Sequence, residues 1–399
     1  MNPTVVISKQ GEPFLDEGQQ WMYRNNVVSM PDVENGSVVD IVTEDGRYMG
    51  TGFLSKESHI TVRILSKNHE DISSGEFFAD RIRKAYAYRK QVEPDNLTNC
   101  RVVFGEADGL AGLVVDRYNG ILVTQISSYG IEKHKKTVYM ALSDVMEEEG
   151  VVVDGIYERN DISIRSKEGL NEYKGPYKGK EFDVNTIINE NGLLLHVNVR
   201  DGQKTGYFLD QKSNRYLVRQ YAKDKIVMDC FSHTGGFALN AALGGAKQVY
   251  SVDVSKTALD QGYKNAKLNH LEDKIKFVQA DVFDFLANAK PGKFDFIILD
   301  PPAFAKNRRS VDHAYQGYKT INRDAMKLLP DGGLLASCSC SRFMEPELFE
   351  QMLQDAAKEA NVTLNLLSVT QQNPDHPIHE TMKETHYLKF YIFRIERNK

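Results

Sequence analysis

The sequence predicts an α/β protein in which a doubly wound parallel sheet follows a small β-barrel and a central α+β domain. Three observations carry this prediction. Short β-rich runs separated by Gly, Asn and Asp turns fill the first 74 residues. Strand-like and helix-like stretches then mingle as far as about residue 195, and apolar runs alternate regularly with helical segments from residue 196. We therefore expect domains at 1–74, 75–195 and 196–399.

The composition is that of a soluble globular protein, with 41% hydrophobic and 26% charged residues among 399. It contains no run of eighteen apolar residues, so we expect no membrane span. The first ten residues lack a basic patch followed by an apolar stretch, so no secretory signal is expected. Four cysteines without regular spacing do not make a disulfide framework. We expect a cytoplasmic protein with reduced thiols.

The formal charge of −5 argues against a protein coated in positive charge. Residues 1–74 carry 6 Lys and Arg against 11 Asp and Glu, whereas residues 201–250 carry 7 against 4. Lys204, Lys212, Arg215 and Arg219 crowd together in the second stretch. If the partner is a nucleic acid, local patches rather than an overall field would hold it.

The N-terminal stretch contains a hairpin signal, because two apolar runs within residues 37–55 are joined by Glu-Asp-Gly. Residues 59–66 alternate apolar and polar side chains. These strands favour a small β-barrel, although a β module without a ligand has the same composition. Residues 75–92 have helical periodicity, with Phe78, Ile82, Ala85 and Tyr86 on one face.

The C-terminal stretch contains five apolar runs, "KIVMDCF", "QVYSVDV", "IKFVQAD", "FDFIILD" and "GGLLASC". Helical segments are expected between them at Phe237–Leu243, Lys256–Asn269, Phe283–Ala289 and Tyr315–Leu329. Continuous apolar runs are typical of buried parallel strands, which need helical crossovers. The pattern predicts a doubly wound sheet, whose ligands bind at the carboxyl ends of the strands.

The first three strand ends suit an adenosine-containing ligand. Gly235 and Gly236 follow the first strand and can bring backbone close to a ligand, but neither a dinucleotide fingerprint nor a P-loop is present. Asp253 ends the second strand and suits ribose hydroxyls. Asp281 ends the third and could accept from an adenine amino group. Each acid could equally be a helix N-cap. Together they outline an adenosine site without a phosphate grip, as S-adenosylmethionine requires, with the methionine tail over residues 229–236.

The fourth and fifth strand ends carry the residues that suggest chemistry. Pro301 and Pro302 cannot continue a ladder, so the chain leaves the sheet at Asp300. Cys338 and Cys340 would face the same side of a strand, but the apolar run stops near Cys338. We therefore expect Cys340 on the loop beyond the strand, beside Asp300.

A cysteine and a carboxyl group facing a methyl donor suit methylation of a pyrimidine at C5. A thiolate adding to C6 makes C5 nucleophilic, and a carboxyl group can stabilise charge on a cytosine ring. Cys340 is the candidate nucleophile and Asp300 the base-recognising acid. Spacing alone leaves a structural reading of Cys340 equally open, and Cys338 and Cys230 read as buried small hydrophobes. The spacing of a zinc site is missing, so no metal is expected.

Several motifs together carry a family resemblance: "GQKTGYFLDQKSNR", "CFSHTGGFAL", "DPPAF", "GYKTINRDAMKLL" and "SCS" followed by "RFM". Over nearly its full length the chain resembles the bacterial 23S rRNA cytosine-5 methyltransferases of the PUA-containing RlmI type. The resemblance implies a PUA-like RNA-binding barrel ahead of a Rossmann-like class I methyltransferase domain. It implies S-adenosyl-L-methionine as the cofactor and large-subunit rRNA as the partner.

The resemblance also implies site residues. Cys340 and Asp300 would be catalytic. The implied cofactor-binding residues are Gln211, Asp229, Phe231, Gly235, Gly236, Asp253, Asp281, Val282 and Asp300. The implied substrate-binding residues are Lys204, Arg215, Pro301, Pro302 and Phe304. Because Ala303 rather than a second cysteine follows Pro302, release of the thiol would need another base.

Other functions stay open from the sequence. Enzymes that methylate a guanine amino group in rRNA share Asp-Pro-Pro and need no cysteine, and a non-catalytic RNA-binding assembly factor could keep the same sheet. A small-molecule methyltransferase would leave nearly half the chain without a purpose. For the oligomeric state, we expect a homodimer.

Overall fold

The computed structural model describes residues 2–179, 181–305 and 307–398, and the chain forms two compact units. The first unit consists of Met1–Ile188, Val197–Leu209 and Pro374–Thr385. The second consists of Asn189–His196, Asp210–Asn373 and His386–Lys399. The two units are therefore interleaved along the sequence, and each is described separately below.

The first unit begins with a six-stranded sheet in the order β2-β6-β5-β4-β1-β3. Its elements are β1 (Thr4–Ile7), α1 (Glu12–Asp16), β2 (Trp21–Tyr23), η1 (Arg24–Asn26), β3 (Val27–Ser29), β4 (Val38–Thr43), β5 (Tyr48–Leu54) and β6 (Ile60–Ser66). The predicted hairpin is confirmed, because β4 and β5 pair antiparallel. The core of this sheet includes Ile7, Leu15, Met22, Ile41 and Val62, which come from strands and from α1.

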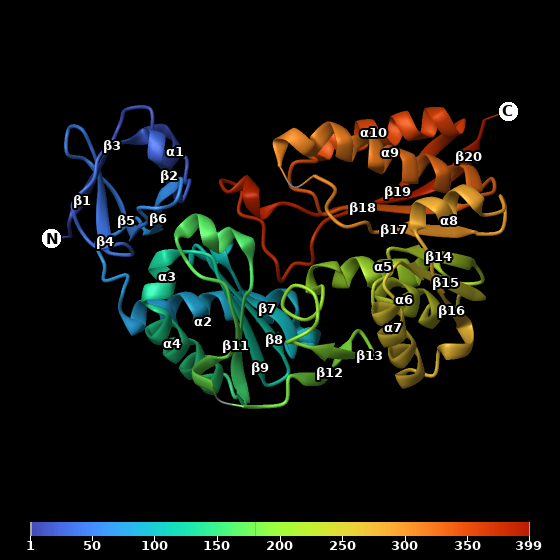
Figure 1. Cartoon of the computed structure of the whole chain (residues 1–399), viewed down its shortest axis with the longest axis horizontal. Coiled ribbons are helices and arrows are strands. Elements are labelled where there is room, and N and C mark those ends of the chain that lie inside the picture. The colour runs from blue at the N-terminus through green and yellow to red at the C-terminus, as the bar shows by residue number, and fades with distance from the viewer. Residues whose placement is uncertain (1, 180, 306, 399) are drawn as a thin grey trace. The chain divides into compact units, whose positions relative to one another are not determined.

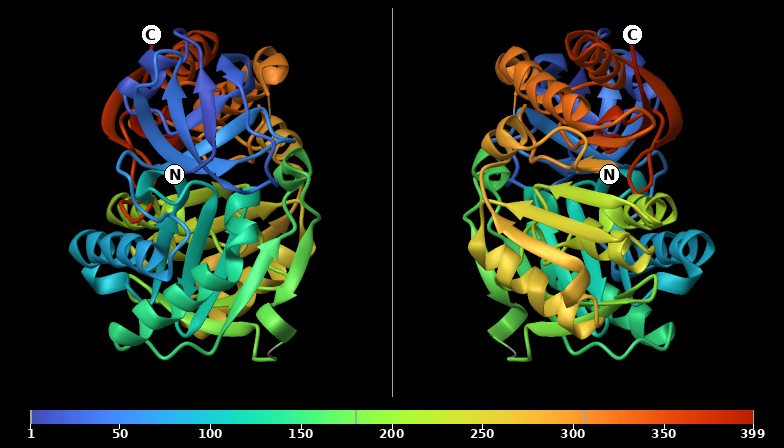
Figure 2. Two further views of the ribbon diagram at one scale, coloured as in Figure 1. Left: turned by 90° about the vertical axis from the view of Figure 1, so that its left-hand side faces the viewer. Right: turned by 90° about the vertical axis from the view of Figure 1, so that its right-hand side faces the viewer.

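A five-stranded sheet in the order β11-β10-β9-β8-β7 forms the centre of the first unit. Its elements are α2 (Gly75–Val92), η2 (Pro94–Asn96), β7 (Asn99–Phe104), η3 (Gly105–Asp108), β8 (Leu113–Tyr118), β9 (Ile121–Ile126), α3 (Tyr129–Lys133), α4 (Lys135–Glu148), β10 (Gly155–Asn160), η4 (Ser163–Glu168), β11 (Tyr173–Pro176) and η5 (Tyr177–Gly179). The predicted helix α2 is confirmed, with all four apolar positions buried. Helices α2 and α4 lie side by side beside this sheet (Figure 2), and their side chains share one apolar core with it.

The N-terminal sheet is tied to the central layer by buried contacts. Phe53 belongs to the same apolar core as the central helices. It packs so closely on Gly130 of α3 that a Cβ there would lie 2.2 Å from the Phe53 Cβ and 2.3 Å from its ring. Arg63 of β6 donates to both carboxylate oxygens of Glu168 at 2.9 Å each. The first 74 residues therefore share one compact unit with the central layer.

The second unit is built on a seven-stranded sheet in the order β16-β15-β14-β17-β18-β20-β19. Its strands are β14 (Ile226–Cys230), β15 (Gln248–Asp253), β16 (Ile275–Gln279), β17 (Phe296–Leu299), β18 (Leu334–Ser339), β19 (Val362–Thr370) and β20 (Lys389–Arg397). Its helices are α5 (Lys212–Tyr221), α6 (Gly236–Leu243), α7 (Lys256–Leu268), α8 (Val282–Asn288), α9 (Val311–Leu328) and α10 (Pro346–Ala360). Short turns η6 (Leu209–Gln211), η7 (Glu272–Lys274), η8 (Arg308–Ser310) and η9 (Lys383–Thr385) complete the chain.

The doubly wound prediction for the second unit is confirmed. The five predicted strands pair parallel, and the four predicted helices are α6, α7, α8 and α9. Helices α5, α6 and α7 lie on one side of the sheet and α8, α9 and α10 on the other (Figure 1). The carboxyl ends of the five parallel strands therefore meet along one edge, where Asp253, Asp300 and Cys340 stand.

The fold has further features that the sequence analysis did not predict. Strands β19 and β20 extend the sheet, and β20 pairs antiparallel with β18. A separate hairpin, β12 (Asn185–Glu190) with β13 (Leu193–Asn198), precedes the large sheet. Between β19 and β20 the chain returns to the first unit for Pro374–Thr385. Within the described residues, no helix is long and apolar enough to cross a membrane.

Candidate active site

The turn between β14 and α6 has an unusual backbone. Phe231, His233 and Gly235 have φ angles of 61°, 48° and 81°, so three alternate residues are left-handed. Non-glycine residues adopt this conformation at a cost, and such strain concentrates at functional sites. A Cβ on Gly235 would meet nothing closer than 3.7 Å. The glycine is therefore needed for its backbone conformation rather than for close packing.

Asp229 precedes this turn and is completely buried. Its Oδ2 accepts from Ala238 N at 2.9 Å, whereas Oδ1 is buried with no hydrogen-bond partner among the described residues. Burial, helped by the nearby charges of Asp300 and Asp253, raises the pKa of this carboxyl group well above its usual range. An unpaired buried carboxylate oxygen is costly, so a donor or a cation is the ligand that this position favours.

Asp253 ends β15 as predicted, Asp281 lies two residues beyond the end of β16, and both carry structural hydrogen bonds. Asp253 accepts from His233 N through Oδ2 and from Ser255 N through Oδ1, each at 2.8 Å. Asp281 is the N-cap of α8, where its Oδ1 accepts from Phe283 N at 2.8 Å. Binding of ribose and adenine by these two residues stays a prediction.

Asp300 follows β17 directly and is held by two neighbours. Gln211 Nε2 donates to Asp300 Oδ1 at 2.9 Å and lies 3.1 Å from Cys338 Sγ. The Cys338 thiol is also hydrogen-bonded to Asp300, and burial raises the pKa of this thiol. Cys338 is buried as predicted, but it acts as more than a small hydrophobe because its neutral thiol helps to orient Asp300.

Cys340 lies just beyond β18, as the sequence predicted. It is half-buried, whereas the three other cysteines, Cys100, Cys230 and Cys338, are buried. Cys340 Sγ lies 4.0 Å from the carbonyl oxygen of Pro301, the first proline of Asp-Pro-Pro. The fourth and fifth strand ends therefore bring the candidate nucleophile and the candidate acid to the same edge.

Tyr318 of α9 fixes the residues on both sides of Cys340, and the sequence reasoning missed it. Its hydroxyl oxygen lies 3.1 Å from Ser339 Oγ and 2.9 Å from Ser341 Oγ. Ser341 N also donates to Ser339 Oγ at 3.2 Å. Burial raises the pKa of Tyr318 to about 12, so the hydroxyl stays neutral. The signal was present, since Tyr318 belongs to the "GYK" motif, but its contact with "SCS" is tertiary.

Phe304 lies in an aromatic cluster beside this clamp. Its ring centroid is 4.6 Å from that of Tyr318, 6.2 Å from that of Phe283 and 6.4 Å from that of Phe231. A Cβ on Gly317 would approach the Phe304 ring to 3.2 Å, so the glycine makes room for it. The contact with substrate expected for Phe304, and for Pro301 and Pro302, stays a prediction.

The basic residues that crowd residues 201–250 do not form one exposed patch. Arg215 is buried, and its guanidinium donates to both oxygens of buried Glu190 at 2.7 and 2.6 Å. Lys212 is buried as well, and Arg219 donates to Asn240 Oδ1. This placement speaks against a direct substrate contact by Arg215. Lys204 is exposed and belongs to the first unit, so its predicted role stays untested.

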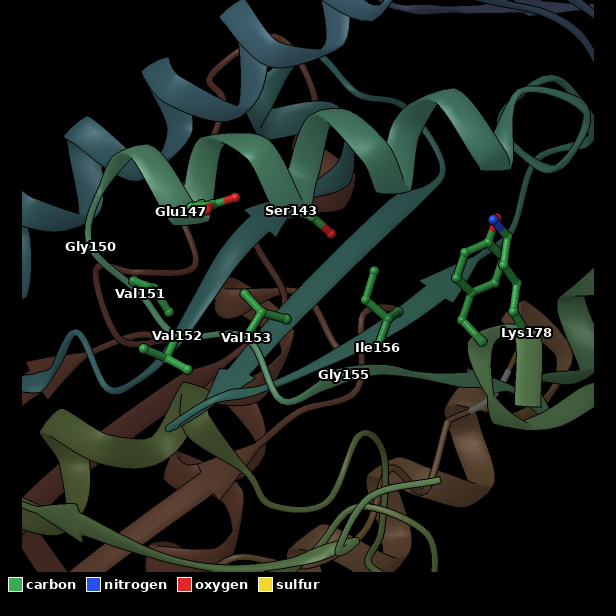
Figure 3. A pocket seen from close by; sticks show the side chains of 10 residues that line it. Ser143, Glu147, Gly150, Val151, Val152, Val153, Gly155, Ile156 and Lys178 are labelled. Atoms are coloured by element: carbon green, nitrogen blue, oxygen red, sulfur yellow. The ribbon is translucent and has the colours of Figure 1, made fainter. Parts of the chain in front are cut away.

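A pocket of about 640 Å³ lies elsewhere, in the first unit (Figure 3). Ser143 and Glu147 of α4 and the valines of the connection to β10 line it, together with Tyr177 and Lys178. None of the predicted site residues lines it. Among the described residues, no group of three or more His, Cys, Asp or Glu side chains could hold a metal ion.

The edge of the second unit suits a cationic cofactor. Asp229, Asp253 and Asp300 are close enough that the charges of the last two raise the pKa of the first. S-adenosylmethionine carries a sulfonium and an ammonium group against one carboxylate, so its net charge is positive. The orphaned Asp229 Oδ1 and the left-handed turn at Gly235 therefore fit this cofactor.

Comparisons with known proteins agree with this fit. Residues 176–394 match the family model of the S-adenosylmethionine-dependent methyltransferases, and residues 5–67 match that of a PUA-like domain. Ribosomal RNA large subunit methyltransferase I of Klebsiella pneumoniae (strain 342) is 36% identical, with 98% of each chain covered. This chain belongs to the same family. The namesake of Shewanella denitrificans is 39% identical, covering 98% of this chain and 99% of its own.

The fold of this chain has also been seen in solved structures. The structure of SMU.776, complexed with SAH, covers 98% of this chain and 100% of its own, with a TM-score of 0.83 at 24% identity. A structure from Streptococcus mutans gives a TM-score of 0.82 at 23% identity. S-adenosylmethionine is the cofactor of this family, and the second unit has the class I methyltransferase sheet.

Proposed function

We propose that this protein transfers a methyl group from S-adenosylmethionine to C5 of a cytosine in large-subunit rRNA, through a covalent bond between Cys340 and C6. The names of the relatives support the rRNA substrate. The observation that carries the chemistry is the position of Cys340, the one half-buried cysteine among the four, against the Asp-Pro-Pro backbone.

The reaction uses the chain's own residues as follows. The thiolate of Cys340 adds to C6, and the π electron pair of the C5=C6 double bond moves into the ring, where Asp300 stabilises the charge at N3 and N4. Bound S-adenosylmethionine would supply the methyl group, which C5 takes up with that electron pair. A base then accepts the C5 proton, and the electrons of that C–H bond restore the C5=C6 double bond as the Cys340 thiolate leaves.

The supporting residues keep the two reacting groups in place. Gln211 and Cys338 orient Asp300, and Tyr318 holds both serines that flank Cys340. A target base must leave its stack to reach a thiol at the end of a strand. The rigid clamp around Cys340 therefore favours a reaction in which a flipped base enters a preformed site.

Trapping tests this proposal. RNA that carries 5-fluorocytosine at the target should remain covalently attached to Cys340, because fluorine blocks the loss of the C5 substituent that frees the enzyme. Cys340→Ala should give no adduct, and Cys338→Ala should still give one. An adduct on Cys338 would contradict the assignment of the nucleophile.

The product can be tested in cells. Mass mapping of rRNA from a strain without this gene should show the loss of a single 5-methylcytosine. Loss of a methylated guanine instead would replace the proposal with guanine amino methylation. An unchanged rRNA in that strain would favour a non-catalytic assembly factor.

A further inference from the structure

A buried lysine stands behind the candidate nucleophile. Lys389 is the first residue of β20, and the antiparallel register pairs it with Ser339, the neighbour of Cys340. Only 4% of Lys389 is exposed. An amino group this deep is rare, because removing an ammonium from water is costly unless an anion compensates for it.

The hydrogen bonds of Lys389 hold the amino group but do not neutralise it. Its Nζ donates to the carbonyl oxygen of Ser341 at 2.8 Å and to that of Tyr387 at 3.0 Å. Both acceptors are neutral, and the first belongs to the other neighbour of Cys340. Within the described part of the chain, no carboxylate forms a salt bridge with this lysine at 4.0 Å or less.

The ionisable groups near Lys389 leave one suitable counter-ion. Cys338, Cys340 and Glu345 favour its charged form, while its charge disfavours that of His386. Glu345 is exposed, so water screens it. The pKa of Cys338 is raised by burial and by Asp300, which keeps that thiol neutral. Cys340 is the remaining group, half-buried and on the same loop whose carbonyl Lys389 binds.

We propose that Lys389 is a positioning residue that keeps Cys340 as the reactive thiolate. The proton of the Cys340 thiol passes to the amine of Lys389, and the resulting ammonium faces the resulting thiolate, so no further reactant is needed. The same ammonium stabilises the thiolate when it leaves C6. This inference rests on the proposed role of Cys340 as nucleophile.

The protonation behaviour of Lys389 is consistent with this pairing. Burial lowers its pKa to about 8, while Cys338, Cys340 and Glu345 act in the opposite direction. A lysine that titrates near neutrality can exchange a proton with a thiol, whose ordinary pKa is about 8.5. An exposed lysine, with a pKa near 10.4, would also attract a thiolate but would stay bound to its proton.

Alkylation of the free enzyme tests the pairing without RNA. The rate at which iodoacetamide modifies Cys340 is followed from pH 5 to pH 10 by peptide mass mapping. In the unmodified sequence, the midpoint of this profile should lie below that of free cysteine. In Lys389→Met the midpoint should rise by about one pH unit or more, and labelling at pH 7 should slow about tenfold.

Control variants separate this effect from a loss of structure. Lys319→Met removes the same charge from a lysine that pairs with Glu359 and should leave the profile unchanged. Lys389→Arg keeps the positive charge and should keep the midpoint low. S-adenosylmethionine binding, measured by calorimetry, reports whether each variant is folded.

Two results would overturn the inference. One is an unchanged midpoint in folded Lys389→Met. The other is a Cys340 profile in the unmodified sequence with a midpoint at or above that of free cysteine, which decides the matter even if the variant does not fold. If either result is found while 5-fluorocytosine RNA is still trapped on Cys340, the role of Lys389 is rejected. The proposed cytosine-5 function is then unaffected.

Discussion

At the residue scale, the strand-end edge of the second unit contains one buried carboxyl group with an oxygen that has no hydrogen-bond partner among the described residues. Asp229 is fully buried, has an unpaired Oδ1, and lies near the charges of Asp253 and Asp300. In the free protein these groups repel one another and favour a proton on Asp229. A bound cation would remove that repulsion, so cofactor binding and the protonation of Asp229 should be linked.

Asp229→Asn tests this linkage. Because the folded-state pKa of Asp229 is raised, its proton favours the folded state at low pH, and this contribution is lost as the pH rises through the raised pKa. The free variant should therefore lose less stability between pH 4 and pH 8 than the unmodified protein. It should bind S-adenosylmethionine more weakly by about 1.5–3 kcal/mol, since a charged hydrogen-bond partner is removed.

Thermal unfolding at several pH values and calorimetry supply the two measurements. Asp260→Asn is the matched control, because Asp260 is an exposed acid of α7 that pairs with Lys256. It should change neither result. Equal cofactor affinity in Asp229→Asn and the unmodified protein would remove Asp229 from the cofactor site.

The two cysteines near the end of β18 should respond differently to substitution. Cys340→Ala should abolish methylation of rRNA while cofactor affinity stays nearly the same, because the thiol acts on the base. Cys338→Ala should reduce the rate without abolishing it, since Asp300 loses one of its two orienting contacts, and should lower stability by on the order of 1 kcal/mol. Single-turnover methylation measures both, and full turnover by Cys340→Ala would reject the cytosine-5 mechanism.

The sequence predicted the residues that stand at strand ends better than those that support them. The positions of Asp253, Asp300 and Cys340 follow from where apolar runs stop, which is a local signal. Tyr318 and Lys389 come from a helix and a strand far along the chain, and only the packing of α9 and the register of β20 bring them to the loop of Cys340. Local periodicity contains no information about such contacts.

At the element scale, the β14–α6 turn shows how strain and function coincide. A left-handed turn lets the chain enter α6 without a side-chain cap, because Gly235 occupies the N-cap position at φ 81°. A Cβ on Gly235 would make only ordinary contacts with Phe277, Gly262 and Leu239, so the backbone conformation alone requires the glycine. The alternation of left-handed residues could not be predicted, because Phe231 and His233 rarely adopt this conformation.

Gly235→Ala separates the two contributions of this glycine. The left-handed backbone should cost about 1–2 kcal/mol of stability, as for any residue with a Cβ. A turn displaced by this strain no longer presents its backbone to the methionine tail expected over residues 229–236, so affinity for S-adenosylmethionine should fall at least tenfold. Gly245→Ala is a close control, because Gly245 has a φ of 88° and its Cβ would also meet nothing nearer than 3.7 Å.

Chemical denaturation and calorimetry of the two variants give the answer. Both should lose similar stability, and only Gly235→Ala should lose cofactor affinity. A similar loss of affinity in both would assign the effect to general destabilisation rather than to the cofactor site.

The same scale shows where element prediction failed. The parallel strands of the second unit can be recognised in the sequence as apolar runs with helices between them. Strand β19 does not fit this pattern, because it has a mostly exposed or half-buried pattern at the edge of the sheet. Strand β20 is mostly buried, but within the described residues no α-helix separates it from β19, so it does not fit the alternation of strands and helices. The β12–β13 hairpin and α5 were also missed, since both are short and rich in polar residues.

At the scale of the whole molecule, the chain does not divide into consecutive pieces. The first unit includes Pro374–Thr385, which lies between two strands of the other unit. Asp375 is fully buried there, accepts from Arg101 N at 3.0 Å, and its carbonyl oxygen accepts from Arg89 at 2.9 Å. The composition of the sequence gives no sign that a C-terminal segment returns to an N-terminal core. The domain boundaries at 74 and 195 therefore stay a prediction. A truncation at either boundary would separate residues of the first unit from one another.

The N-terminal sheet should matter for RNA only while it is anchored to the central layer, and Glu168→Ala tests this idea. Arg63 and Glu168 form an ion pair with two hydrogen bonds, and their side chains are only 7% and 2% exposed. Ser55 Oγ also donates to the Glu168 carboxylate, at 3.1 Å. Removing Glu168 leaves a buried, unpaired guanidinium, which should lower stability by about 3–5 kcal/mol.

The consequences should be confined to the first unit. Unfolding followed by hydrogen exchange should show earlier opening of β5 and β6, while S-adenosylmethionine binding stays unchanged because the cofactor residues belong to the second unit. Methylation of rRNA should fall, with a weaker dependence of RNA affinity on salt as phosphate contacts are lost.

A matched exposed contact provides the control for this anchor. Lys133 and Glu34 also join the N-terminal sheet to the central layer, at 3.0 Å, but the Glu34 side chain is 86% exposed. Glu34→Ala should therefore cost less than about 1 kcal/mol and leave methylation intact. If Glu168→Ala unfolds the N-terminal sheet and rRNA is still methylated at the full rate, the PUA-like domain does not position the substrate. If the PUA-like domain does position the substrate, the loss of activity on rRNA should follow the opening of β5 and β6. It should not follow any change in cofactor affinity.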